Sequence, residues 1–147
     1  MANEAVIDAL AEQVGCYQRL AKLARIQHEH IQQSQTDALL DVLKSRQEVL
    51  DQIGRLERTV APVKQSWNEF AQSLAEPNRG RAEALVTEAR ELLREITECD
   101  RNDVLVLQQR TLNIGKQINQ ATAARKVNTK YATAAYGSSQ SKMNVQS

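Results

Sequence analysis

Aromatic, glycine and proline residues are all scarce in this 147-residue sequence. Aromatic side chains make up 3% of it, and it contains five Gly and two Pro. A β-sandwich or an α/β enzyme needs more turn residues and more β-branched or aromatic strand residues than this. The commonest residues are instead Ala, Leu, Glu, Gln and Arg, which favour helices strongly. The composition therefore predicts an all-α protein, and the length is that of a single domain.

Long hydrophobic runs are also absent. No stretch approaches the roughly 20 apolar residues that a membrane span requires, so we expect no stable membrane insertion. The first turns carry the acidic residues Glu4, Asp8 and Glu12, whereas a secretory signal needs a basic start followed by an apolar stretch. We therefore expect a cytoplasmic protein.

Residues that could carry chemistry are few. Cys16 and Cys99 lie 83 positions apart, and two reduced thiols are favoured over the alternative, a disulfide, in a reducing compartment. His28, Glu29 and His30 are neighbours in sequence, so on a helix they point in different directions and cannot converge on one metal ion. The sequence has no glycine-rich phosphate loop and no candidate nucleophile with a convincing base. We expect no metal, no cofactor and no enzymatic activity.

Acidic residues are missing from the C-terminal third. The last one is Asp103, and residues 104–147 carry six basic residues, whereas the first 103 residues carry 13 basic and 18 acidic ones. Such asymmetry indicates that the C-terminal part contacts another molecule. Six cations without interleaved aromatic residues are too sparse for nucleic-acid binding, which we do not expect.

Apolar residues recur with helical spacing in the first half of the chain. One stripe predicts a helix: Ile7, Leu10, Val14, Tyr17, Ala21, Ala24, His28 and Ile31. Ser34 and Asp37 have the spacing of a capping box, so this helix should end near Gln33, a continuous helix being the alternative. The stripe of the second helix is interrupted by Arg46 and comprises Leu39, Leu43, Leu50, Ile53, Leu56 and Val60. Gly54 within it suggests a close approach of another helix.

Pro62 should either kink this second helix or begin a new segment. Helical spacing continues afterwards through Trp67 and Phe70, which we interpret as core anchors, with an exposed docking patch as the alternative. Residues 76–80 read as a loop, so the two long arms that it joins should pack antiparallel. The second arm is expected over residues 81–131, with a stripe of Ala82, Leu85, Val86, Ala89, Leu92, Leu93 and Ile96.

The apolar stripe of the second arm is interrupted by the polar residues Asp100 and Asp103. After Asp103 the helix carries apolar residues on two faces. Leu107, Ile114 and Ile118 continue the first face, whereas Leu105 and Leu112 lie opposite, at 100° per residue. A helix that is apolar on two faces is either buried on both or binds a partner. We therefore predict partner binding at Leu105, Leu112, Ile114 and Ile118. Residues 1–131 should form an elongated antiparallel bundle of about three long helices, and residues 132–147 a mobile, disordered tail.

Taken together, these patterns resemble the FlgN family of flagellar type III export chaperones. The likeness begins with Tyr17-x-x-Leu20-x-x-Leu23, Gln27 and Ile31, and continues with Asp37-Ala38-Leu39-Leu40, Leu43-Lys44 and Leu50-x-x-Ile53-x-x-Leu56. It ends with Asn128-x-x-Tyr131 and Tyr136-Gly137. The sequence departs from the family at Gln27 and Gln47, where Glu is usual.

The resemblance implies a small cytosolic chaperone that binds hook-associated subunits of the hook–filament junction, keeps them unassembled and delivers them to the export gate. It further implies that the C-terminal helical region binds these subunits and that a C-terminal tyrosine, Tyr131 or Tyr136, contacts the gate component. The alternative is a structural coiled-coil or filament subunit that self-associates through the same apolar stripes.

Overall fold

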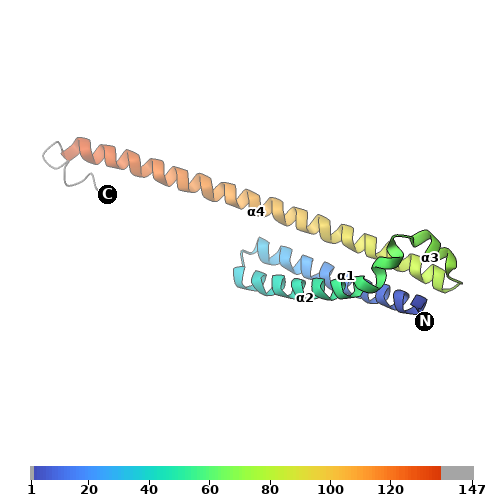
Figure 1. The fold of residues 1–147 in the computed structure, drawn as a ribbon. Coiled ribbons are helices and arrows are strands. Elements are labelled where there is room, and N and C mark those ends of the chain that lie inside the picture. The colour runs from blue at the N-terminus through green and yellow to red at the C-terminus, as the bar shows by residue number, and fades with distance from the viewer. Residues whose placement is uncertain (1, 137–147) are drawn as a thin grey trace. The chain divides into compact units, whose positions relative to one another are not determined.

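A computed structural model describes the backbone of residues 2–136 and the side chains of residues 3–130. It contains four helices, α1 (Ala2–Gln32), α2 (Thr36–Lys64), α3 (Trp67–Ser73) and α4 (Asn78–Tyr136), and no strand among the residues described (Figure 1). The all-α prediction is confirmed, and three of these helices are long. The expected second arm is α4, which begins three residues earlier and ends five residues later than predicted. Of the predicted tail, residues 132–147, the first five residues belong to α4, and residues 137–147 lie outside the described part. The division into a bundle and a tail remains a prediction.

The chain divides into two units, Met1–Val104 and Leu105–Ser147. The first holds α1, α2, α3 and the beginning of α4, and the second holds the rest of α4. Among residues 2–136, no helix is long and apolar enough to cross a membrane.

The turn between α1 and α2 differs from the predicted capping box. The Gln35 N–H donates to the His30 carbonyl at 2.9 Å, and the Ser34 N–H donates to that of Ile31 at 3.1 Å. Ser34 has a φ of 56°. These bonds form a Schellman motif, in which a residue in the left-handed conformation ends the helix. Ser34 therefore terminates α1, and α2 begins after Gln35 without a side-chain cap.

The buried face of α2 differs from the predicted stripe at two of its six positions. Val42 and Val60 are buried and Val49, Ile53 and Leu56 are half-buried, whereas Leu43 and Leu50 are exposed. The prediction was wrong for these two leucines because α2 carries two neighbouring apolar stripes. The close approach predicted at Gly54 is also absent, since a methyl group added there would meet no atom within 4 Å.

Pro62 lies inside α2, which ends two residues later at Lys64. Trp67 then begins α3, where its ring centroid is 5.5 Å from that of Phe70. Phe70 is buried and Trp67 packs against the same cluster, so their prediction as core anchors is confirmed. The Arg79 side chain donates to the carbonyls of Ala71, Gln72 and Leu74 at the end of α3. The last carbonyls of a helix lack partners further along the helix; here the Ala71 carbonyl also accepts from the Leu74 N–H at 3.2 Å. Because Arg79 already belongs to α4, the predicted loop ends earlier than expected.

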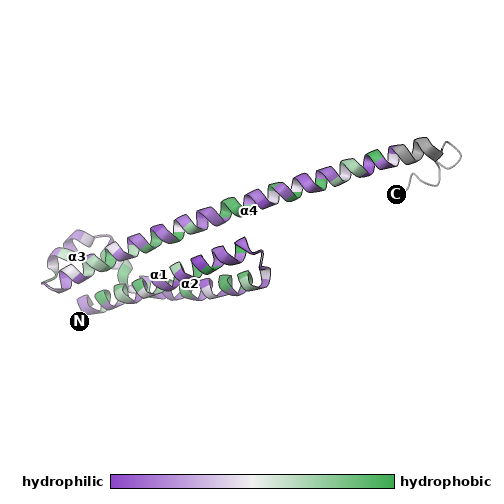
Figure 2. Cartoon of the chain, turned by 180° about the vertical axis from the view of Figure 1, so that it is seen from behind, coloured by the Kyte–Doolittle hydropathy of each residue, from purple (hydrophilic) through white to green (hydrophobic). Residues whose placement is uncertain are grey.

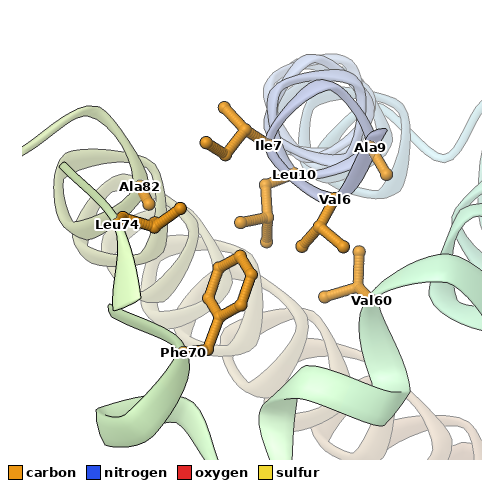
Figure 3. Close-up of a cluster of buried hydrophobic side chains, with 8 residues drawn as sticks. All are labelled: Val6, Ile7, Ala9, Leu10, Val60, Phe70, Leu74 and Ala82. Carbon is orange, nitrogen blue, oxygen red and sulfur yellow. The ribbon is translucent and has the colours of Figure 1, made fainter. Parts of the chain in front are cut away.

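Two apolar clusters stabilise residues 1–104. In the first, Phe70 projects from α3 toward side chains of α1 and α2 (Figure 3); its buried members are Val6, Ile7, Ala9, Leu10, Val60, Phe70, Leu74 and Ala82. The second joins Leu20 and Ala21 of α1 to Ile96 of α4. Later residues of α1 meet later residues of α4 in the second cluster, so α4 runs parallel to α1. For α2 the order is reversed, since Val60 belongs to the first cluster and Val49 to the second, so α4 runs antiparallel to α2. Burying a large apolar side chain contributes about 1.5–3 kcal/mol.

Both cysteines are free thiols, as expected. Cys16 is fully buried, and the Cys99 thiol donates to the Ala24 carbonyl at 3.3 Å. Burial is the main cause that raises the pKa of Cys99, and the carboxylates of Asp103 and Asp100 raise it further.

Candidate partner-binding surface

The four apolar residues predicted to bind a partner all lie on α4, in residues 105–118. Leu105, Leu112, Ile114 and Ile118 are each between 56% and 61% exposed. Isolated exposed hydrophobic residues are ordinary on protein surfaces, but contiguous ones mark interaction sites. Here they recur along one stretch of helix, which Figure 2 shows as green residues interspersed with purple ones.

The two faces predicted from the 100° helical repeat are both exposed in this unit. Leu105 and Leu112 lie on one face, and Ile114 and Ile118 lie on the other together with Leu107, which is also exposed. Of the two alternatives for such a helix, burial on both faces or an accessible surface, the structure has the second. We call the set Leu105, Leu107, Leu112, Ile114 and Ile118 the C-terminal apolar surface.

Sequence reasoning missed Val127, which is 49% exposed. It follows Leu105 by 22 residues and so lies within about 40° of it around the helix. The helical repeat could have predicted that Val127 lies on the same face as Leu105. Polar residues lie between Leu112 and Val127 on this face, so the sequence showed no continuous apolar stripe there. Val127 extends the Leu105 face by four turns toward the end of the helix.

The helix around this surface is cationic. Arg110, Lys116, Arg125, Lys126 and Lys130 lie between residues 104 and 130, and no Asp or Glu does. An acidic partner would therefore make apolar contacts and also be attracted electrostatically. This attraction raises the association rate more than it raises the affinity.

Tyr131 and Tyr136 lie in the last turns of α4, with Tyr136 at its end. Their side chains are outside the described part of the structure, so the assignment of a docking tyrosine remains a prediction.

A layer of polar side chains crosses residues 1–104 where the predicted stripes are interrupted. Arg46 of α2 donates two hydrogen bonds of 2.7 Å to the Asp100 carboxylate of α4 and one, also of 2.7 Å, to the side-chain amide oxygen Oε1 of Gln27. The hydrogen bonds to Asp100 raise the pKa of Arg46 above its ordinary value. Asp103 is 2% exposed; its Oδ1 lies 2.6 Å from His28 Nδ1, and the Gln27 amide donates to its Oδ2 at 3.3 Å.

The polar layer accounts for His28, a member of the predicted stripe of the first helix, which is half-buried and has Asp103 as its partner. His30 instead contacts Gln35, at 2.8 Å. Within the described residues, no group of three or more His, Cys, Asp or Glu side chains could hold a metal ion. The layer joins three helices through charged hydrogen bonds, so we interpret it as structural.

One protein family matches nearly the whole chain. The family model described as FlgN protein matches residues 1–142. No curated protein and no solved structure matches the chain.

Proposed function

Because the chain belongs to the FlgN family of flagellar export chaperones, we propose that it binds hook-associated subunits in the cytoplasm before they assemble. It keeps these subunits of the hook–filament junction unassembled and delivers them to the type III export gate. The observation that carries this proposal is the C-terminal apolar surface, exposed on a helix without acidic residues.

The proposed mechanism is stoichiometric binding. An amphipathic helix of the client lies with its apolar side on the face formed by Leu105 and Leu112. A second client segment covers the opposite face, formed by Leu107, Ile114 and Ile118. The client's own apolar stripe, through which it would otherwise assemble, is then covered. Release at the export gate exposes it again.

The test of this surface is the double substitution Leu105→Asp/Leu112→Asp. Because both side chains are exposed, the protein should keep its thermal melting temperature. A charge buried in an apolar interface costs several kcal/mol, and each 1.4 kcal/mol is a factor of ten, so affinity for a purified hook-associated subunit should fall by about 100-fold or more. Calorimetric titration measures this.

Asn113→Asp/Gln120→Asp is the matched control. These two exposed polar residues lie on the same helix, are also one heptad apart and add the same charge. The control should bind the client normally. A folded Leu105→Asp/Leu112→Asp protein that still binds its client would refute the surface, and equal losses in both variants would show that charge alone is responsible.

The docking tyrosine is tested separately. Tyr131→Ala and Tyr136→Ala should both leave client binding unchanged, and the one that removes the docking tyrosine should reduce export of the client. Normal export by both variants would remove the proposed role from these residues.

A second candidate, a subunit that self-associates, draws on the same exposed surface and on Leu40, Leu43 and Leu50 of α2, which are also exposed. Sedimentation at several concentrations separates the two. A chaperone keeps a constant mass until the client is added, whereas a filament subunit grows in mass by itself.

A further inference from the structure

A cavity of about 310 Å³ opens within residues 1–104. Side chains of all four helices line it, α2 contributing near its end and α4 between residues 85 and 93. Its aliphatic lining consists of Leu10, Val14, Val60, Leu85, Val86, Ala89 and Leu93. Trp67, the one tryptophan of the sequence, forms part of the wall.

The polar side chains of this cavity are hydrogen-bond donors or are already engaged. The Gln13 amide donates to Glu57 at 2.8 Å, and Lys64 forms an ion pair with the same carboxylate. Arg90 is exposed and has no ion pair or hydrogen bond among the residues that the structure describes. Burial raises the pKa of Tyr17 above its ordinary value, so its hydroxyl stays protonated at neutral pH and can donate. No carboxylate lines the cavity.

Leu93 connects the cavity to the surface of α4. It lines the cavity and is 41% exposed, so the apolar lining extends out of the cavity onto the surface of α4. The volume lies at the lower end of the range for ligand pockets, about 300–1,000 Å³. A small cavity that continues as exposed apolar surface fits an anchor side chain of a helix lying across it.

We propose that this cavity binds an acidic amphipathic helix of a protein partner, with one large apolar side chain inserted beside Trp67 and a neighbouring carboxylate bound by Arg90. The Tyr17 hydroxyl is a further donor in the lining of the cavity. The C-terminal third of this chain is unsuitable as the occupant, in the same molecule or in a second copy, because residues 104–147 contain no Asp or Glu. The acidic residues of the chain all lie in residues 1–103, whose helices already pack against one another. The partner is therefore a different protein, and the cavity shares no residue with the proposed client surface.

Trp67 provides the measurement, since it is the chain's one tryptophan and lies on the cavity wall. The probes are two synthetic amphipathic helical peptides without tryptophan, with the same Leu and Phe stripe flanked by Glu in one and by Lys in the other. The Glu peptide should shift Trp67 emission to shorter wavelength and bind at least about tenfold more tightly than the Lys peptide. Equal affinities would overturn the proposal.

Two substitutions and a control sharpen this test. Arg90→Glu should reverse the preference, so that the Lys peptide binds more tightly. Arg94→Glu, an exposed position one turn further along α4 that does not line the cavity, should leave the preference unchanged. Ala89→Phe should fill the cavity, keep the melting temperature and reduce binding of the Glu peptide at least about tenfold.

Three other outcomes would overturn the proposal: equal effects of Arg90→Glu and Arg94→Glu, unchanged peptide binding by a folded Ala89→Phe protein, or a Trp67 shift with dodecanoate but none with the Glu peptide. The last would assign the cavity to a small amphiphile. The proposal is also independent of the client surface. Leu105→Asp/Leu112→Asp should bind the Glu peptide normally, and Ala89→Phe should bind the hook-associated subunit normally.

Discussion

At the scale of single residues, Ser34 and Gly54 have backbone roles that their side chains do not reveal. Ser34 adopts a positive φ to end α1, a conformation that is costly for residues with a Cβ and free for glycine. Gly54 lies in the exposed interior of α2, where glycine is the less favourable residue. Each position therefore holds the residue that would suit the other better.

Ser34→Gly should raise the free energy of unfolding by about 0.5–1 kcal/mol, because glycine is the preferred residue at this position of a Schellman motif. Urea unfolding measures the change. Glu48→Gly, in the exposed interior of α2, is the control and should lower stability by a similar amount. A loss of stability with Ser34→Gly would show that the serine side chain contributes more than its backbone conformation costs.

Gly54→Ala should stabilise the protein by about 0.4–1 kcal/mol, since alanine reduces the freedom of the unfolded chain and its methyl group meets no other atom. The same unfolding experiment applies. A destabilised Gly54→Ala protein would mean that another chain or helix packs closely against this position in solution.

At the scale of helices, Arg46 connects α2 to α4 and α1 through one guanidinium. Its side chain is 14% exposed and meets Asp100 with two parallel hydrogen bonds. Such paired geometry fixes the position of one helix along another, because a shift of one turn would separate both bonds. The polar layer therefore sets the register of α4, up to Asp103, against α1 and α2.

Arg46→Met should cost about 1–3 kcal/mol of stability, because Asp100 and Gln27 lose their partner. Arg46→Met/Asp100→Leu should recover most of the loss, since no unpaired charge remains. A double-mutant cycle from denaturant unfolding measures the coupling. Additive losses without coupling would contradict a specific pairing of these two side chains.

At the scale of the whole molecule, the buried apolar clusters lie in residues 1–104. In the described part of α4 beyond Val104, by contrast, the leucines and isoleucines and Val127 are exposed, and Val106 is half-buried. Stability and client binding should therefore depend on different parts of the chain. Substitutions that alter one property should leave the other unchanged.

Leu10→Ala and Leu112→Ala compare the two parts with the same chemical change. Leu10 is buried, so its truncation should cost about 2–5 kcal/mol. Leu112 is exposed, and its truncation should change stability by less than about 0.5 kcal/mol. Denaturant unfolding of both variants measures this. Equal losses would mean that the helix around Leu112 is packed in the free protein.

The sequence by itself determined the helical class, the extent of the first helix and the apolar character of residues 105–118. These features depend on local propensity and on a 3.6-residue repeat, which neighbouring residues specify together. The match of residues 1–142 to the FlgN family agrees with the pattern of spaced residues that first suggested it.

Only the tertiary structure decided which face of α2 is buried and what the polar interruptions do. Val42 and Val49 adjoin Leu43 and Leu50, so the repeat fits either stripe, and the choice depends on which one α1 and α4 cover. Arg46 interrupts one stripe and Asp100 another, yet their hydrogen bonds join positions 54 residues apart. The cavity beside Trp67 likewise needs side chains from four helices, and no local pattern specifies where these meet.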